Sequence, residues 1–165
     1  MIRVGLGQDS HRIKLKAQSL KLKASRLGGI EIKNLEIIAN SDGDVILHAL
    51  GNALSSAIGG DSLGTWADEM CLQQGITDSQ EFVKAIMKKV KDQNYQVNNA
   101  SLAIEAKKPK ISLETFQKMK QKISQLLEID SSAVGITITS GEGLTAFGQG
   151  KAIQVFAVVT LKHEN

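Results

Sequence analysis

The segment 152–161 reads AIQVFAVVTL, and its apolar residues occupy both sets of alternating positions. Successive side chains of a strand point to opposite faces of a sheet, so both faces of this strand have to be covered. We expect helices on one face. The rest of the sequence offers only three helices with a clear apolar stripe, and we therefore expect another subunit on the second face.

Strand patterns alternate with helix patterns along the chain. The predicted strands cover 2–8, about 29–33, 96–106, 133–139 and 151–162, and the predicted helices begin at Ser41, at Asp78 and after Pro109. Between the first two helices, the glycine-rich segment 59–64 is expected to be a flexible loop. This order predicts an α+β fold of two layers, in which a mixed β-sheet packs on three main helices. No repeat or low-complexity linker divides residues 1–165, which we expect to form a single domain.

The composition is typical of a soluble protein that folds without disulfide bonds. The chain has 165 residues, of which 42% are apolar, enough to bury a core without disulfide staples. Its single Cys71 cannot pair within the chain, which suits a reducing cytoplasm, the location we expect. The first residues read as a strand instead of a signal peptide, and no apolar run approaches the length of a membrane span.

The net charge of +3 and the isoelectric point near 9.0 favour an anionic partner. Much of the positive excess lies between residues 14 and 26, at Lys14, Lys16, Lys21, Lys23 and Arg26. A nucleic-acid surface normally interleaves such charges with aromatic residues, but only 4% of this chain is aromatic. We therefore interpret the basic stretch as a solvated loop, expect no nucleic-acid partner, and favour a phosphorylated small molecule.

Asp9, His11 and His48 are the candidate ligands of a metal ion. A catalytic zinc ion commonly takes three ligands of His or carboxylate type and leaves a fourth position open. Asp9 and His11 are two residues apart at the end of a predicted strand, so both side chains lie on one face. His48 would come from the helix beginning at Ser41, where Asp44, four positions earlier, is predicted to hydrogen-bond the ring nitrogen away from the metal.

The alternative is a surface histidine on a helix and an ordinary loop at 9–11. Scarcity favours the metal site, because two of the three histidines of the chain fall in these two segments.

The segment 137–144, between the last two strands, is the second candidate site. Its glycines let the backbone approach a ligand closely, and the hydroxyls of Thr139 and Ser140 can donate to phosphate oxygens. Glu142 offers a hard oxygen ligand suited to magnesium. By itself, this segment is also compatible with a simple turn between strands.

Together, these segments resemble the 2-C-methyl-D-erythritol 2,4-cyclodiphosphate synthase family over nearly the whole chain. The most specific match is SDGDVILHAL at 41–50, which follows Asp9-Ser10-His11 in the expected order. Further matches are RVG at 3–5, LGGIEI at 27–32, Gly60-Asp61, the segment 106–110, and the turn 142–144 running into Gly150.

The resemblance implies a reaction, cofactors and an assembly. The 2-phosphate of 4-diphosphocytidyl-2-C-methyl-D-erythritol 2-phosphate would attack its own β-phosphate, closing the 2,4-cyclodiphosphate and releasing CMP. Zinc would bind Asp9, His11 and His48, while magnesium or manganese would bind Glu142 and the substrate diphosphate. The active sites would lie between the subunits of a homotrimer, with the sheets facing its centre. Positioning and charge neutralisation would drive this reaction without a protein nucleophile.

The resemblance also distributes roles among residues. Catalytic roles would fall on Asp44, Thr139, Ser140 and Glu142. Asp61 would bind the erythritol hydroxyls, and the neighbouring subunit would supply the cytidine and diphosphate side of the site. The substrate-binding set would comprise Asp9, His11, Asn40, Ser41, Asp61, Ala106, Lys110, Ile111, Thr139 and Ser140.

Several positions depart from the pattern of this family, including the following three. Asn40 stands where a histidine is usual, Asn52 stands where an aspartate is usual, and Gln149 replaces an arginine. That arginine helps an axial cavity of the trimer hold prenyl diphosphates in relatives, so its loss weakens the case for binding such lipids here.

Two other functions remain open. A zinc phosphohydrolase would use the same three ligands to activate water, but it needs a general base that the sequence does not clearly provide. A non-catalytic trimer that binds a nucleotide or a prenyl diphosphate would fit the three departures. The retained Asp9, His11 and His48 argue against it, because a binding module does not need ligands around an open metal position.

Overall fold

The computed structural model describes residues 1–15, 25–33, 35–39 and 41–164. Asn40 and the lysines at 16, 21 and 23 lie outside these residues. The described strands are β1 (Ile2–Leu15), β2 (Ser25–Leu27), β3 (Ile30–Ile32), β4 (Leu35–Ile37), β5 (Tyr95–Glu105), β6 (Val134–Thr139) and β7 (Ala152–His163). The described helices are α1 (Val45–Ala57), α2 (Leu63–Leu72), α3 (Ser79–Asp92) and α4 (Leu113–Leu127), with short 3-10 turns η1 (Ser131–Ala133) and η2 (Gly141–Gly143).

The main sheet has five strands in the order β4-β1-β7-β5-β6. Strands β5 and β6 run parallel, since α4 crosses between them, whereas the other neighbours run antiparallel. The prediction of a mixed sheet in an α+β fold is therefore confirmed. Strands β2 and β3 form a separate hairpin, turned by Gly28 and Gly29, whose positive φ angles of 60° and 77° suit glycine.

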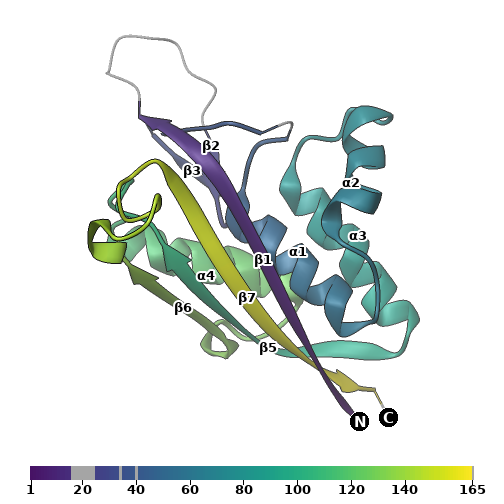
Figure 1. Cartoon of the computed structure of the whole chain (residues 1–165). Coiled ribbons are helices and arrows are strands. Elements are labelled where there is room, and N and C mark those ends of the chain that lie inside the picture. The colour runs from purple at the N-terminus through teal and green to yellow at the C-terminus, as the bar shows by residue number, and fades with distance from the viewer. Residues whose placement is uncertain (16–24, 34, 40, 165) are drawn as a thin grey trace.

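The helices pack on one face of the sheet (Figure 1). Helix α1 lies against β1 and β7 and is buried almost all round, because α3 packs on its other side. On the helix side, β7 contributes a buried row of Ile153, Val155, Ala157, Val159 and Leu161. The expectation that helices cover one face of the final strand is therefore confirmed. None of the helices in the described ranges has the length and apolarity needed to cross a bilayer.

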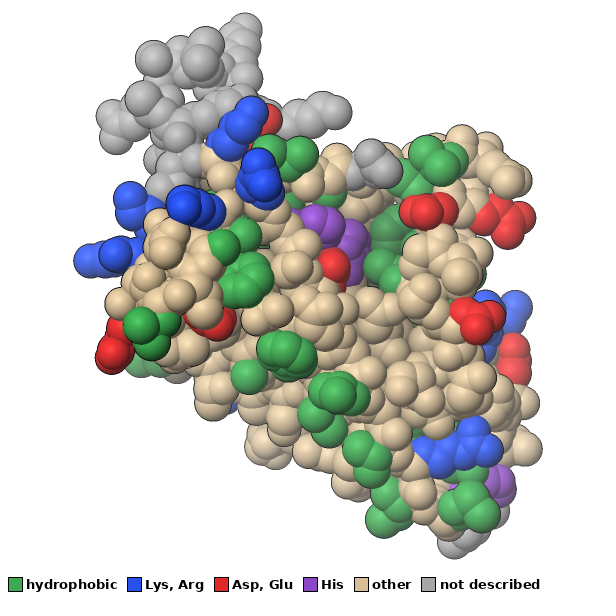
Figure 2. Space-filling view, viewed as in Figure 1, with side chains coloured by type: hydrophobic (Ala, Val, Ile, Leu, Met, Phe, Trp, Pro, Cys, Tyr) green, Lys and Arg blue, Asp and Glu red, His purple; other side chains and the backbone are tan. Residues whose placement is uncertain are grey.

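The other face of the sheet lacks a helical cover within the described residues (Figure 1). Its apolar side chains include Val4 and Leu6 on β1 and Phe156 and Val158 on β7, with 63%, 61%, 44% and 37% of their surfaces exposed. Leu6 and Val158 are paired across the two strands. Figure 2 shows green apolar side chains gathered along this face. We define the exposed sheet face as Val4, Leu6, Phe156 and Val158.

Several element predictions were wrong in detail. Helix α1 is capped by Asp44, whose carboxylate accepts from the Leu47 N–H, so the helix begins three residues later than a Ser41 cap implies. The predicted strand near 29–33 is the short β3, flanked by β2 and β4. The segment 59–64 leads into α2, a helix in addition to the three that were predicted. Ala67 is the only buried residue of α2, so this helix has no apolar stripe from which it could be predicted.

Candidate metal centre

Strand β1 presents Asp9 and His11 to the helix layer. These residues lie opposite Val155 and Ile153 of β7, both of which are buried under the helices. The predicted placement of both side chains on one face of the strand is confirmed, and the structure shows that this face is the one covered by the helices.

Helix α1 reaches this part of β1 because two glycines precede Asp9. A Cβ atom at Gly5 would overlap the Ala53 carbonyl, and one at Gly7 would overlap the Ala49 carbonyl. The helix backbone therefore lies directly on the strand, and His48 arrives next to Asp9. The spacing of these glycines from the Asp9-x-His11 pair was a signal in the sequence for this close approach.

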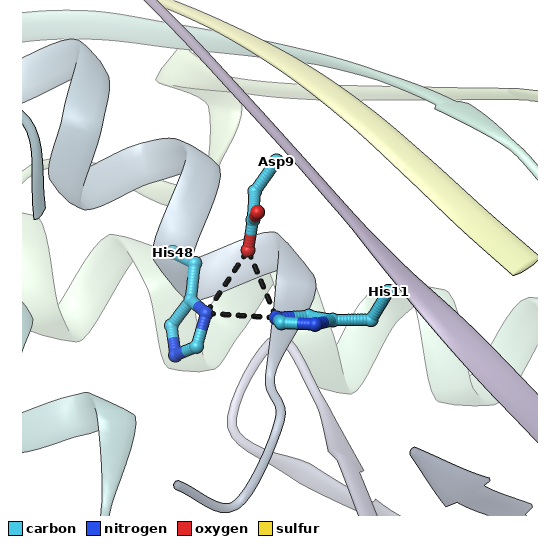
Figure 3. A group of neighbouring side chains, drawn as sticks. All are labelled: Asp9, His11 and His48. Carbon is cyan, nitrogen blue, oxygen red and sulfur yellow. Dashed lines mark hydrogen bonds and ion pairs between the residues drawn. The ribbon is translucent and has the colours of Figure 1, made fainter. Parts of the chain in front are cut away.

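Three ligand atoms converge at this point, as Figure 3 shows. Asp9 Oδ2 lies 3.0 Å from His11 Nε2 and 3.0 Å from His48 Nδ1, and the two nitrogens are 3.1 Å apart. Tetrahedral zinc with bonds of about 2.0–2.1 Å places neighbouring ligand atoms about 3.3 Å apart. One carboxylate and two imidazoles at this spacing fit a divalent metal ion, and they form the one cluster of this kind found among the described residues.

The charge of Asp9 suits this role. Burial raises the pKa of its carboxyl, but hydrogen bonds and charge interactions with His11 and His48 outweigh burial and hold the pKa well below its usual range. The carboxylate therefore stays ionised at neutral pH and is available as a ligand.

The hydrogen-bond partners of the His48 ring nitrogen that faces away from Asp9 and His11 differ from the prediction. Its Nε2 lies 2.9 Å from Ser79 Oγ and 3.2 Å from Ser41 Oγ. The predicted hydrogen bond between the Asp44 carboxylate and His48 is wrong. Asp44 instead accepts from the backbone N–H groups of Gly28 and Gly29.

The physical reason is the place of Asp44 before the first turn of α1. A side chain at the cap folds over the helix end toward unpaired backbone donors, so it does not lie beside the residue four positions later. Complete burial raises the pKa of Asp44, while its three backbone donors act in the opposite direction. Asp44 therefore holds the β2–β3 turn against α1.

A cavity of about 530 Å³ opens beside the three ligands. In Figure 2 it appears as a hollow next to purple histidine side chains. The remaining lining residues are Ile38, Ala39, Ser41, Asn52, Ser62, Leu63, Gly64, Ala67, Asp68, Cys71 and Phe82. Six of the fourteen lining residues come from α2 and its N-cap Ser62, a helix that the sequence did not predict.

Asn52 holds this wall in place. Its Oδ1 accepts from the Leu63 N–H at 2.7 Å, and its Nδ2 donates to the Gln8 carbonyl at 3.3 Å. The amide thus connects α1 to both β1 and α2, which a carboxylate with acceptors only could not do.

The second group of predicted residues lies apart from this cavity. Ala106, Lys110, Ile111, Thr139, Ser140 and Glu142 do not line it. They belong to two adjacent segments, joined by hydrogen bonds from Ala106 N to the Thr139 carbonyl and from Lys107 N to the Phe147 carbonyl. Glu142 is exposed at the tip of η2 with a φ of 48°. The structure therefore brings the second group together, but away from the metal ligands.

Asp61 belongs to neither group, although it directly precedes residues that line the cavity. Its side chain is exposed and does not line the cavity. Its carbonyl accepts a hydrogen bond from Ser55 Oγ at 2.5 Å, which fixes the turn at the start of α2.

Comparison with known proteins agrees with this geometry. The sequence model of the YgbB family matches residues 2–162. The chain belongs to the YgbB family. A relative named 2-C-methyl-D-erythritol 2,4-cyclodiphosphate synthase, from Chlamydia trachomatis serovar A, is 42% identical over 160 residues, 96% of this chain and 87% of the relative. A relative of the same name from Chlamydia abortus is 41% identical over 96% of this chain and 88% of the length of that relative.

Several solved structures are also similar to this chain. A structure from Plasmodium falciparum described as IspF in a CDP complex has a TM-score of 0.85 and 30% identity, covering 99% of this chain and 97% of its own. The bifunctional IspDF of Campylobacter jejuni has a TM-score of 0.87 and 26% identity, covering 100% of this chain and 43% of its own. The α+β fold with a mixed sheet is thus shared with these proteins.

Proposed function

We propose that this chain converts 4-diphosphocytidyl-2-C-methyl-D-erythritol 2-phosphate into 2-C-methyl-D-erythritol 2,4-cyclodiphosphate and CMP. Membership of the YgbB family and the name shared by its relatives support this proposal. The observation that carries it is the convergence of Asp9, His11 and His48 beside a cavity of about 530 Å³. We place this activity in the cytoplasm.

The chemistry requires no protein nucleophile. An oxygen of the 2-phosphate forms a new bond to the β-phosphorus, and the bond from that phosphorus to the oxygen bridging to CMP breaks. The leaving CMP retains that oxygen and its charge. Because anionic groups approach one another, the protein has to hold them in line and neutralise their charge.

The residues divide this work between two sites. Asp9, His11 and His48 would hold zinc, which when bound supplies a positive charge and polarises a phosphate oxygen. Glu142 would hold magnesium or manganese together with the diphosphate, because a carboxylate is a hard ligand. Thr139 and Ser140 would donate their hydroxyls to phosphate oxygens, while Ala106, Lys110 and Ile111 would contact the cytidine diphosphate portion. Ser41 and Asp61 would contact the erythritol phosphate portion.

We further propose a homotrimer in which each active site is shared by two subunits. The exposed sheet face supports this arrangement, because apolar side chains of that size favour burial against a partner. The separation of the second residue group from the cavity also supports it. With the sheets facing the centre, the segments 106–111 and 139–142 of one chain would complete the cavity of its neighbour.

Phosphorus NMR of the incubated substrate tests the proposal. A cyclic diphosphate together with CMP would support it, whereas release of inorganic phosphate would identify a phosphohydrolase. Unchanged substrate, with zinc and magnesium supplied, would indicate a binding protein. Asp9→Ala is the matched control, because it removes a ligand from the metal site without altering the second residue group.

A further inference from the structure

His48 is held from both sides of its ring. Its Nδ1 faces Asp9 and His11, where the ligand atoms converge. Its Nε2 faces the hydroxyl of Ser79, the first residue of α3, which is completely buried. A neutral imidazole has one N–H and one free nitrogen, so the partner of Nε2 determines which nitrogen can bind a metal.

The hydrogen bonds of Ser79 determine the direction of this contact. Its hydroxyl has one proton and donates it to the Asp42 carboxylate in a short hydrogen bond. An ionised carboxylate accepts only, so the Ser79 proton points away from the histidine. The Ser79 oxygen then accepts from His48 Nε2, which must be protonated.

Asp42 is itself fixed firmly enough to orient Ser79. Its second carboxylate oxygen accepts from the Ser79 backbone N–H at 3.2 Å, and its first accepts from the Asp44 N–H at 3.2 Å. The backbone N–H of Asp42 donates to the Thr77 carbonyl at 2.9 Å. These contacts join the loop before α1 to the start of α3.

We propose that Asp42 and Ser79 are positioning residues that keep the proton of His48 on Nε2 and leave the Nδ1 lone pair free for the metal. The inference rests on the proposed metal centre and adds two residues that act on it through His48. Ser41 is a weaker partner, because its oxygen lies farther from Nε2 and also accepts from the Gly43 N–H at 3.2 Å.

Ser79→Ala tests this role, and Ser124→Ala is the control. Both serines are buried, but the hydroxyl of Ser124 donates to the Gln121 carbonyl within α4, away from the metal ligands. Ser79→Ala keeps the backbone hydrogen bond to Asp42, so the start of α3 should remain folded. Loss of a hydrogen-bond partner of a metal-bound histidine typically lowers metal affinity about 10- to 100-fold. We expect that loss in zinc affinity for Ser79→Ala, measured by competition with a chelator, and less than about a twofold change for the control.

A spectroscopic measurement separates positioning from a general structural effect. Nitrogen NMR of the zinc-loaded wild-type protein should show a proton on His48 Nε2 that exchanges slowly with solvent. Ser79→Ala should accelerate that exchange, whereas Ser124→Ala should not.

Asp42→Asn tests the direction of the contact through a different residue. An amide nitrogen would face a backbone N–H in either orientation, and in one it would donate to Ser79 Oγ and free the hydroxyl proton to turn toward His48. We therefore expect zinc affinity to fall in Asp42→Asn as well. Wild-type protein that takes up no zinc would refute the metal centre itself. Zinc-binding wild type with unchanged affinity in both Ser79→Ala and Asp42→Asn would refute the positioning role alone.

Discussion

The metal side and the second residue group are built in opposite ways. Asp9, His11 and His48 stand on a strand and a helix, with their ring and carboxylate atoms in mutual contact. By contrast, Lys110, Thr139, Ser140 and Glu142 are exposed and lie at strand ends or in connections. A site supported by packed elements is complete within one chain, whereas exposed loop residues acquire their final surroundings from something that docks on them.

This difference indicates how the activity is divided. Metal binding should be a property of each folded chain, and turnover should be a property of the assembly. Four experiments test that division.

Asp9→Ala should have the largest effect, because it removes one of three ligands at the centre of the metal side. We expect zinc affinity to fall by more than the roughly 100-fold that the loss of an outer hydrogen-bond partner can cause, and turnover to be lost. Circular dichroism should remain close to wild type, since the side chain of Asp9 is only partly buried. Metal analysis together with the phosphorus NMR assay measures both effects. If Asp9→Ala retains zinc at the wild-type level, Asp9 is not a ligand of the metal.

Mixing two inactive variants tests whether the sites are shared. His48→Ala removes the metal side, and Lys110→Glu alters the second group. In a cyclic trimer, each mixed assembly holds one site with both halves wild type. With random equal mixing, about three quarters of the trimers are mixed and each has one good site in three, so activity should recover to about one quarter of wild type. Each variant refolded alone is the control. Absence of recovery, with mixed trimers verified by native mass spectrometry, would place the site within one chain.

Glu142→Gln should separate the two metals. The amide is a poorer ligand for a hard divalent cation and does not touch the imidazole site. We expect zinc content to stay at the wild-type level, while turnover falls on the order of tenfold, or about 1.4 kcal/mol in the activation barrier. The dependence of rate on magnesium concentration should shift upward. An unchanged magnesium dependence would assign Glu142 a different role.

Arg26→Ala should have the smallest effect, and it probes the support of α3 next to Ser79. Arg26 Nη1 lies 2.8 Å from Asp78 Oδ2 in a half-exposed ion pair, and such pairs contribute about 0–1 kcal/mol to the free energy of unfolding. Burial raises the pKa of Asp78, but the Gln80 N–H and Arg26 together outweigh burial and hold the pKa below its usual value.

The pair therefore stabilises the fold above the unfolded pKa of about 3.9, and this contribution is lost as pH falls through the lower folded value. Urea unfolding of Arg26→Ala and wild type should differ at pH 7 and converge at strongly acidic pH. Zinc affinity at pH 7 should not change. A large loss of zinc would show that the start of α3 depends on Arg26 more than its contacts indicate.

The fold class and the three candidate metal ligands could be predicted from the sequence alone. Alternation along 152–161 required a strand buried on the helix side, and the structure has that strand at the centre of a mixed sheet. The spacing of Asp9 and His11 required that both side chains share one face. These properties are local, since they follow from the residue types and from the period of a strand.

The groups that surround these ligands could not be predicted, because they come from distant parts of the chain. Ser79 lies 31 residues after His48, and no local pattern pairs a helix-start serine with a distant imidazole. Asp44 turned to Gly28 and Gly29 because those backbone donors are brought to it by the β2–β3 hairpin. Helix α2 carries no apolar stripe, yet it supplies five of the fourteen residues that line the cavity, and Asn52 holds its first residue, Leu63, by a hydrogen bond. Such contacts depend on how distant elements pack, and packing is a property of the whole chain instead of any one segment.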